Sequence, residues 1–355
     1  GGGGRLSRPP PPHAEGTYSS MSFVARRLAF MLGVLFAATF LAYSAMNMLG
    51  DPLFNVVGFY AKVDCDAVLA GEIDDVIGTR AGSSLGECQL VAEAREKYHL
   101  NDPLPVRYGR WIGAMAQGDF GESFKNYMPV STILAERLPK SLLLMGMSVS
   151  IALGIAIPWA VAAAYRANQR ADKASTAVSF GLLSIPGFAL GVILLYFFVV
   201  RWEIFPSRFV DDDLFSRLRS LTLASLTLGL PLAAVYQRLL RTDLITTLQE
   251  DFVITAKAKG LSDRRIMFRH VLRPSLFGMV TVVGLNTASL FAGSIIIEQI
   301  YSIPGIGREL YVSIVRDDNT VVLACVVVIV GAFVIINTAV DLLYSYLDPR
   351  VRRDT

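Results

Sequence analysis

Residues Asp251–Leu276, DFVITAKAKGLSDRRIMFRHVLRPSL, form a basic and helix-forming stretch between two long apolar runs. Three small residues, Thr255, Ala256 and Ala258, lie in its first part. Gly260 follows them, and glycine allows a tight turn or a close approach of two backbones. The order of residues therefore predicts a helix that ends at a glycine turn.

The second half of the stretch is predicted to be another short helix. Ser262 is placed to cap a helix through Arg264–Leu272, and Asp263 is favourable in its first turn. Pro274 is then expected to stop the helix. Together the two helices and the turn would form a small knob with a basic surround. A solvated basic loop would explain the Lys and Arg residues, but not the order of small residues, glycine and proline.

The surrounding sequence is apolar enough to cross a membrane several times. A helix needs about 20 apolar residues to span the hydrocarbon core of a bilayer. The chain has six uncharged runs of this kind: Leu28–Gly50, Ser141–Tyr165, Ala174–Val200, Ser220–Gln237, Leu276–Ile297 and Asn319–Val340. No globular core needs six such segments, so we expect an all-α polytopic membrane protein.

The distribution of basic residues predicts the orientation of the chain. Short loops rich in Lys and Arg stay in the cytoplasm. Eight Lys or Arg residues lie between the fourth and fifth runs, and others precede the first run and follow the sixth. Both termini are therefore expected in the cytoplasm. The net charge of +3 follows from this topology and gives no reason to expect a nucleic-acid partner.

These runs divide the chain into expected parts. Residues 1–22 are expected to be a disordered tail, either native or in part added by cloning, because glycine and proline give it nothing to pack with. The remaining parts are a first transmembrane helix at 23–50, an extracytoplasmic segment at 51–140, a core of five transmembrane helices at 141–346 with a cytoplasmic loop at 241–275, and a cytoplasmic tail at 347–355.

Two cysteines, Cys65 and Cys88, lie in the expected extracytoplasmic segment. Disulfides form in such a compartment. A Cys65–Cys88 bridge and two unpaired thiols both remain open from the sequence. Cys325, in the last run, fits a small buried apolar residue.

A few polar or helix-breaking residues interrupt the apolar runs. Ser184 and Pro186 mark a kink that either lines a substrate path or only improves packing. Asn286 lies mid-span and is expected to face the bundle or water, because a buried polar group in lipid is costly. Glu298 ends the fifth run and either borders an outward gate or caps the span at the interface.

Several kinds of chemistry are missing from the sequence. There is no GxxxxGK[ST] pattern, so the chain has no phosphate-binding P-loop. The three histidines are scattered, and no zinc or catalytic spacing is present. We therefore expect no bound cofactor, no metal site and no catalysis by this chain alone.

The stretch quoted first resembles the EAA loop of ABC importer permeases. That motif has Glu-Ala-Ala, then glycine, then Ile-x-Leu-Pro. Here Ile254-Thr255-Ala256 keeps only the second alanine, while Gly260 and Leu272 fit and Pro274 comes one residue late. The peptide-importer branch of the family usually has TAxAKGL, and residues 255–261, TAKAKGL and ending at Leu261, match that form.

Other motifs support the same resemblance in the same order along the chain. They are Asp102-Pro-Leu-Pro-Val106, Gly118-Asp-Phe-Gly121 with Ser123, Arg137-Leu-Pro139, Ser184-Ile-Pro186, Glu298 with Ser302-Ile-Pro-Gly-Ile-Gly307, and Leu347-Asp-Pro-Arg-Val351. The resemblance covers most of Met21 to Arg353. An insertion around residues 56–86 fits poorly, and its role is open.

The resemblance implies six transmembrane helices of the type I ABC importer permease fold, with an outer segment between the first two. It also implies a second homologous permease subunit, two cytosolic ATPase subunits that carry ATP and Mg, and an extracytoplasmic substrate-binding protein. The implied substrate is a di- or oligopeptide, and the implied location is the plasma (inner) membrane of a prokaryote, in contact with lipid. The coupling residues would be Thr255, Ala256, Ala258, Gly260, Leu261, Ser262, Leu272 and Pro274.

Three alternatives are weighed against this interpretation. Nickel or another small solute is carried by the same permease family, although no cluster of soft or imidazole ligands appears in the runs. An autonomous secondary transporter would need intramembrane ionisable groups and often an internal repeat, and the runs have few such groups and no detected repeat. A membrane enzyme would need a catalytic constellation.

Overall fold

The computed structural model describes residues 16–49, 88, 92–93, 95–96 and 101–347. Almost all of these residues are helical. The elements are α1 (Gly16–Leu49), α5 (Leu104–Ala116), α6 (Val130–Tyr165), α7 (Arg170–Ser184), α8 (Gly187–Leu195), the π-helical turn η2 (Tyr196–Arg201), α9 (Leu214–Thr247), α10 (Asp251–Ala258), α11 (Asp263–Arg265), the π-helical turn η3 (Ile266–Val271), α12 (Leu272–Ile300), α13 (Ile306–Val315) and α14 (Asn319–Leu347).

Five helical segments in the described part of the chain are long and apolar enough to cross a membrane. They are Ala29–Met48, Val130–Tyr165, Leu214–Thr247, Asp263–Ile300 and Asn319–Val340. A sixth crossing requires the bent pair formed by α7 with α8 and η2. The all-α polytopic fold is therefore confirmed, and five of the six predicted runs correspond to long helices.

The third predicted run is not a single kinked helix. Between α7 and α8 the chain bends by 96°. Ile185 has extended backbone angles (φ −84°, ψ 121°), because a following proline disfavours the helical conformation. Pro186 is then the N-cap residue of α8. Prolines at 139, 158 and 231 lie inside α6 and α9, which continue through them.

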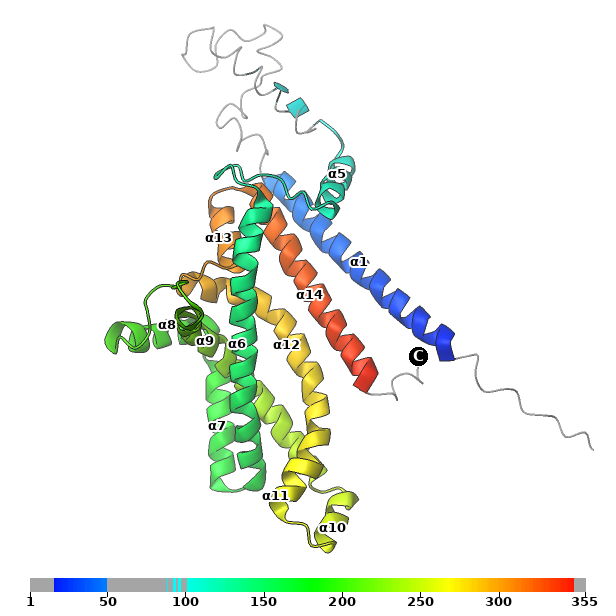
Figure 1. Ribbon diagram of the computed structural model, residues 1–355, viewed down its shortest axis with the longest axis vertical. Coiled ribbons are helices and arrows are strands. Elements are labelled where there is room, and N and C mark those ends of the chain that lie inside the picture. The colour runs from blue at the N-terminus through cyan, green and yellow to red at the C-terminus, as the bar shows by residue number, and fades with distance from the viewer. Residues whose placement is uncertain (1–15, 50–87, 89–91, 94, 97–100, 348–355) are drawn as a thin grey trace, which may run out of the picture.

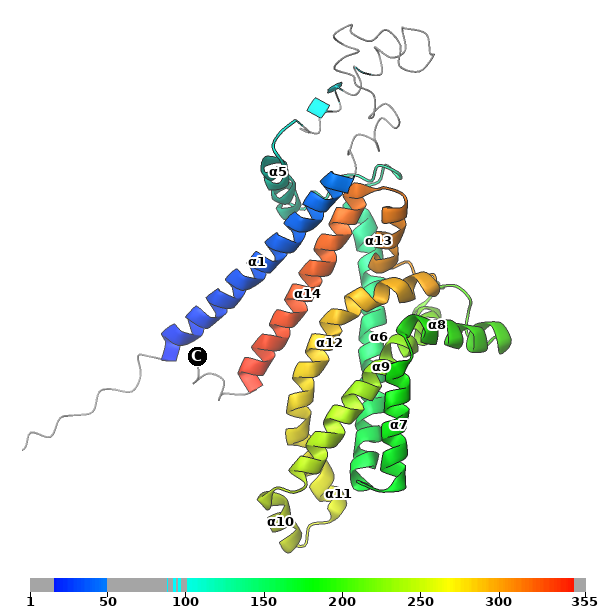
Figure 2. The same cartoon turned by 180° about the vertical axis from the view of Figure 1, so that it is seen from behind.

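The centre of the molecule is formed by α6, α9 and α12. The pair of α6 and α9 has the most extensive contacts in the structure, and α12 packs on α9 and α14. Figures 1 and 2 both show α14 between α12 and α1, so α1 lies at the edge of the bundle. Apolar side chains such as Leu32 and Leu41 are exposed on α1, as expected for a helix that faces lipid.

The two ends of the bundle carry different elements. The helices α5 and α13 lie at one end, and α10 and α11 lie at the other (Figure 1). The segment Asp263–Ile300 is helical over 38 residues, or roughly 57 Å at 1.5 Å per residue. This path length exceeds the hydrocarbon thickness of about 30 Å, so the helix is long enough to cross the bilayer even where it is tilted or curved. We refer to the two ends as the α5 end and the α10 end.

Candidate functional site

The segment from α10 to η3, residues 251–271, has the predicted order of helix, turn and helix. Gly260 has φ +77°, in the left-handed region that glycine adopts without strain. Its N–H donates to the carbonyl of Lys257 at 2.9 Å, and the N–H of Leu261 donates to the carbonyl of Ala256 at 3.3 Å. These two bonds close the end of α10. A Cβ at Gly260 would meet no atom within 4 Å, so it is backbone conformation alone, and not packing, that favours the glycine.

The prediction that the Ser262 side chain caps the second helix is wrong. Ser262 occupies the N-cap position with extended angles, but its side chain accepts no capping hydrogen bond. Its carbonyl accepts from the N–H of Ile266 at 3.0 Å instead. Ser262 and Asp263 are exposed, so solvent can satisfy the first N–H groups of the helix.

The prediction that Pro274 stops this helix is also wrong. The chain is helical from Asp263 through η3 into α12, and Pro274 lies in the first turn of α12. A proline ring normally clashes with the carbonyl four residues earlier. Here the preceding turn is π-helical, with a wider spacing of hydrogen bonds, which gives the ring room.

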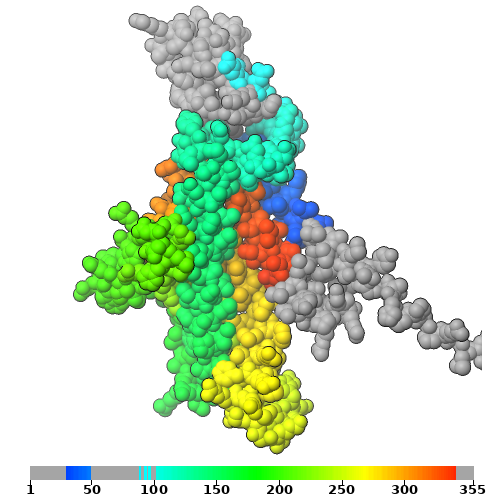
Figure 3. Space-filling view, viewed as in Figure 1, coloured from blue at the N-terminus to red at the C-terminus, as the bar shows by residue number. Residues whose placement is uncertain are grey.

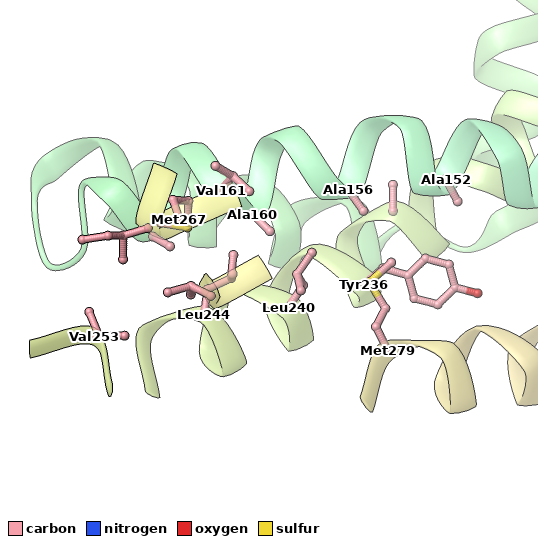
Figure 4. Close-up of a cluster of buried hydrophobic side chains, with 14 of the residues drawn as sticks. Ala152, Ala156, Ala160, Val161, Tyr236, Leu240, Leu244, Val253, Met267 and Met279 are labelled. Carbon is pink, nitrogen blue, oxygen red and sulfur yellow. The ribbon is translucent and has the colours of Figure 1, made fainter. Parts of the chain in front are cut away.

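Buried side chains anchor the α10–η3 segment to the rest of the bundle. Val253, Ile266, Met267 and Val271 are each at most 1% exposed, and Ala256 is 8% exposed. They share one cluster with residues of α6 and α9, among them Ala160, Val161, Leu240 and Leu244 (Figure 4). The segment is therefore fixed on the ends of α6 and α9. The spacing of these apolar residues was a usable signal that sequence analysis missed.

The other face of the α10–η3 segment is exposed. In the space-filling view the segment stands out at the α10 end, in yellow (Figure 3). Three large apolar residues, Phe252, Ile254 and Phe268, are 46%, 61% and 50% exposed. A cavity of about 450 Å³ is lined by Ser262, Arg264, Arg265 and Phe268. Exposed apolar groups rimmed by cations are typical of a surface that binds a protein partner.

The other residues predicted for coupling divide between these two faces. Leu261 and Leu272 are half-buried against the anchoring cluster. Thr255 and Ala258 are exposed, and the Thr255 hydroxyl donates to the carbonyl of Asp251 within α10.

The four predicted pathway residues lie on different elements. Ser184 ends α7 and is exposed beside the bend, and Pro186 is the N-cap residue of α8. Asn286 is half-buried in the middle of α12, and Glu298 is fully buried near its end. Within the described part of the chain, no hydrogen bond joins any two of them. The structure thus brings together the residues predicted for coupling, but not those predicted for the pathway.

Two polar contacts between distant elements were not predicted from the sequence. Ser141 on α6 donates a hydrogen bond to Glu298 on α12. Asp172 on α7 forms an ion pair with Arg241 on α9 and is 3% exposed. Neither pair has a sequence motif, because their partners are 157 and 69 residues apart.

The proposed disulfide remains a prediction. Cys88 is buried, and Cys65 lies outside the described residues. We expect digestion of the non-reduced, alkylated protein to yield one peptide pair linked through Cys65 and Cys88. Cys325, which is free and buried in α14, should be alkylated after denaturation and serves as the control. Two alkylated peptides in place of the linked pair would exclude the bridge.

Comparisons with known proteins place this arrangement in a family. Residues 156–353 match the model of the binding-protein-dependent transport system inner membrane component family. The chain is 37% identical to the oligopeptide transport system permease protein AppB of Bacillus subtilis (strain 168) over 72% of this chain and 83% of that protein. It is 30% identical to the glutathione transport system permease protein GsiC of Escherichia coli (strain K12) over 94% of this chain and 99% of that protein.

A solved structure has the same fold. The match is to an inward-facing structure of the MetNI methionine ABC transporter, with a TM-score of 0.51 and 19% identity, over 61% of this chain and 96% of that chain. This likeness concerns the fold alone. The sequence matches over most of the chain, together with the fold, show that the chain belongs to the binding-protein-dependent transport system inner membrane component family.

Proposed function

We propose that this chain is one of two permease subunits of an ATP-driven importer, and that it forms part of the pathway for di- and oligopeptides. The observation that carries the proposal is the α10–η3 segment. It is buried on one face against α6 and α9, exposed on the other, and continuous with α12. A segment built in this way can accept a force from a partner and pass it to the membrane helices.

The partner at this surface is proposed to be an ATPase subunit. Two such subunits would carry the ATP and Mg, and this chain would bind neither. Phe252 and Phe268 offer apolar contact area, and Arg264 and Arg265 offer positive charge toward an acidic cleft. Closure of the ATPases would displace the α10–η3 segment and so drive alternating access.

The proposed orientation puts the α10 end in the cytoplasm of a prokaryote and the α5 end outside the plasma (inner) membrane. The exposed Lys257, Lys259, Arg264 and Arg265 at the α10 end support it, because basic loops remain in the cytoplasm. In Figure 1, α1 begins and α14 ends toward the α10 end, so both termini would be cytoplasmic. The extracytoplasmic binding protein would dock at the α5 end.

Peptides are the favoured substrate class because the matched relatives are named as oligopeptide, peptide and glutathione permeases. Nickel or another small solute is the second candidate within the family. An autonomous secondary transporter is disfavoured, because it has no ATPase subunit that would bind the exposed face of the α10–η3 segment.

The partners are tested by purification of the tagged chain from native membranes in mild detergent. We expect a second permease and two ATPase subunits to copurify. ATP hydrolysis by the complex should rise when the binding protein and a peptide are added together. A complex without an ATPase would contradict the proposal. Stimulation of ATP hydrolysis by nickel and not by peptides would contradict only the proposed substrate class and leave the proposed partners unchanged.

A further inference from the structure

We propose that Ser141 and Glu298 form a clamp that makes the α5-end portions of α6, α12 and α13 move as one body when α12 is displaced. The clamp would position these elements and would not contact the transported solute. The inference rests on the proposed function, since it concerns how a movement at the α10 end reaches the opposite end.

The clamp is centred on the carboxylate of Glu298, which is 0% exposed. One oxygen, Oε1, accepts a hydrogen bond from the Ser141 hydroxyl at 2.7 Å. The other, Oε2, accepts from the backbone N–H of Arg308 at 2.9 Å. The Ser141 Oγ in turn accepts from the backbone N–H of Ile306 at 2.8 Å. One side chain of α12 is thereby tied to α6 and to the first turn of α13.

Two glycines allow this approach. A Cβ at Gly305 would lie 2.5 Å from both the Cδ of Glu298 and the Oγ of Ser141. A Cβ at Gly307 would lie 2.7 Å from the backbone Cα of Ile295. These distances are shorter than real contacts, so the chain from Gly305 into the first turn of α13 fits around the carboxylate only with glycine at both positions.

Further contacts hold the same segment in place. The N–H of Ile303 donates to the Glu298 carbonyl at 2.9 Å, and the guanidinium of Arg308 donates to the Ser302 carbonyl at 3.0 Å. Ile303 and Ile306 are both 0% exposed and pack into two different apolar clusters. The connection from α12 to α13 is therefore a closely packed, hydrogen-bonded segment.

A second tie joins α6 to α13 directly. Arg137 of α6 forms an ion pair with Glu309 of α13 at 3.2 Å. It lies one helical turn from Ser141 on the same helix. Two contacts about one turn apart oppose rotation of α13 relative to α6 better than one contact would.

The position of Glu298 connects the clamp to the coupling surface. Asp263–Ile300 is one unbroken helical stretch, with the exposed α10–η3 surface at its first end and Glu298 at its last turn. Its continuous backbone hydrogen bonds connect the two ends of this stretch, so a displacement of the first end is passed to the last. A buried carboxylate is costly to leave without donors, so the clamp resists opening during that displacement. Opening of the pathway would then occur between this body and the second permease.

The test compares two serine substitutions on the same helix in the complete importer, reconstituted in liposomes. Ser141→Ala removes the hydroxyl that joins α6 to Glu298. Ser148→Ala is the matched control, since Ser148 is equally buried but its hydroxyl bonds only the Leu144 carbonyl of its own helix. The readout is the number of labelled peptides imported per ATP hydrolysed, which does not depend on how much complex assembles.

We expect Ser141→Ala to lower this ratio about threefold to tenfold, as loss of one coupling contact would. Ser148→Ala should leave it unchanged. Glu298→Gln keeps an oxygen that accepts from the Arg308 N–H. It should therefore lower the number of peptides imported per ATP less than Glu298→Ala does. Equal ratios for Ser141→Ala and Ser148→Ala, or failure of Ser141→Ala and Glu298→Gln to assemble at all, would overturn the coupling role. If the wild-type importer shows no ATP-driven import, the proposed function itself fails.

Discussion

Replacement of Gly260 by valine is expected to reduce peptide uptake about tenfold or more while the protein still inserts in the membrane. Gly260 has φ +77°, and a β-branched residue in this region costs on the order of 1–3 kcal/mol. No neighbouring atom lies within 4 Å of the missing Cβ, so the substitution changes the turn and not the packing. The exposed residues on either side of the turn would then no longer form one surface.

Two variants control for this effect. Gly260→Asn should retain most uptake, because asparagine tolerates the left-handed region. Gly181→Val introduces the same side chain at a helical glycine of α7 that also has open space around it. Uptake and ATP hydrolysis by each complex are measured together. Normal uptake with Gly260→Val, or equal losses with valine and asparagine, would contradict a role for this turn.

Removal of the Asp172 carboxylate is expected to destabilise the protein by about 3 kcal/mol. Asp172 is 3% exposed and accepts two hydrogen bonds from Arg241. It also accepts from the backbone N–H of Asn168 at 2.8 Å. Asp172→Ala leaves the Arg241 side chain, which is 22% exposed, without its counter-charge. The midpoint of thermal unfolding in detergent measures the loss.

An exposed pair between α5 and the residues just before it provides the control. Arg110 pairs with Asp102, and their side chains are 53% and 34% exposed. Asp102→Ala should therefore cost less than about 1 kcal/mol. The double variant Asp172→Leu with Arg241→Met should recover much of the stability, because it buries no unpaired charge. A double variant as unstable as Asp172→Ala would show that the ion pair is not the cause.

The long apolar runs made the membrane helices predictable, but they did not predict where each helix begins and ends. The run Ser220–Gln237 lies within α9, which continues from Leu214 to Thr247. Hydropathy marks only the part of a helix that suits hydrocarbon, whereas the helix itself continues past charged residues such as Arg217 and Arg241. The helix–turn–helix geometry of the α10–η3 segment was predictable because its small residues and glycine lie close together in the sequence.

The sequence does not determine which prolines bend or end a helix. Pro186 accompanies a 96° bend, yet Pro158 lies inside a continuous α6. The extensive packing of α6 on α9 holds the backbone helical on both sides of Pro158. Pro274 is accommodated by the π-helical turn before it. Such outcomes depend on tertiary neighbours, as does the contact of Ser141 with Glu298, and a single sequence does not contain that information.

The central claim is that this chain imports peptides by coupling to ATP hydrolysis. Its most direct test is accumulation of a labelled tripeptide in liposomes that contain the complete importer, with the binding protein at the α5 end. We predict accumulation against a concentration gradient only when ATP is supplied at the α10 end, and none when an ion gradient replaces ATP. Accumulation driven by an ion gradient without ATP would contradict the account.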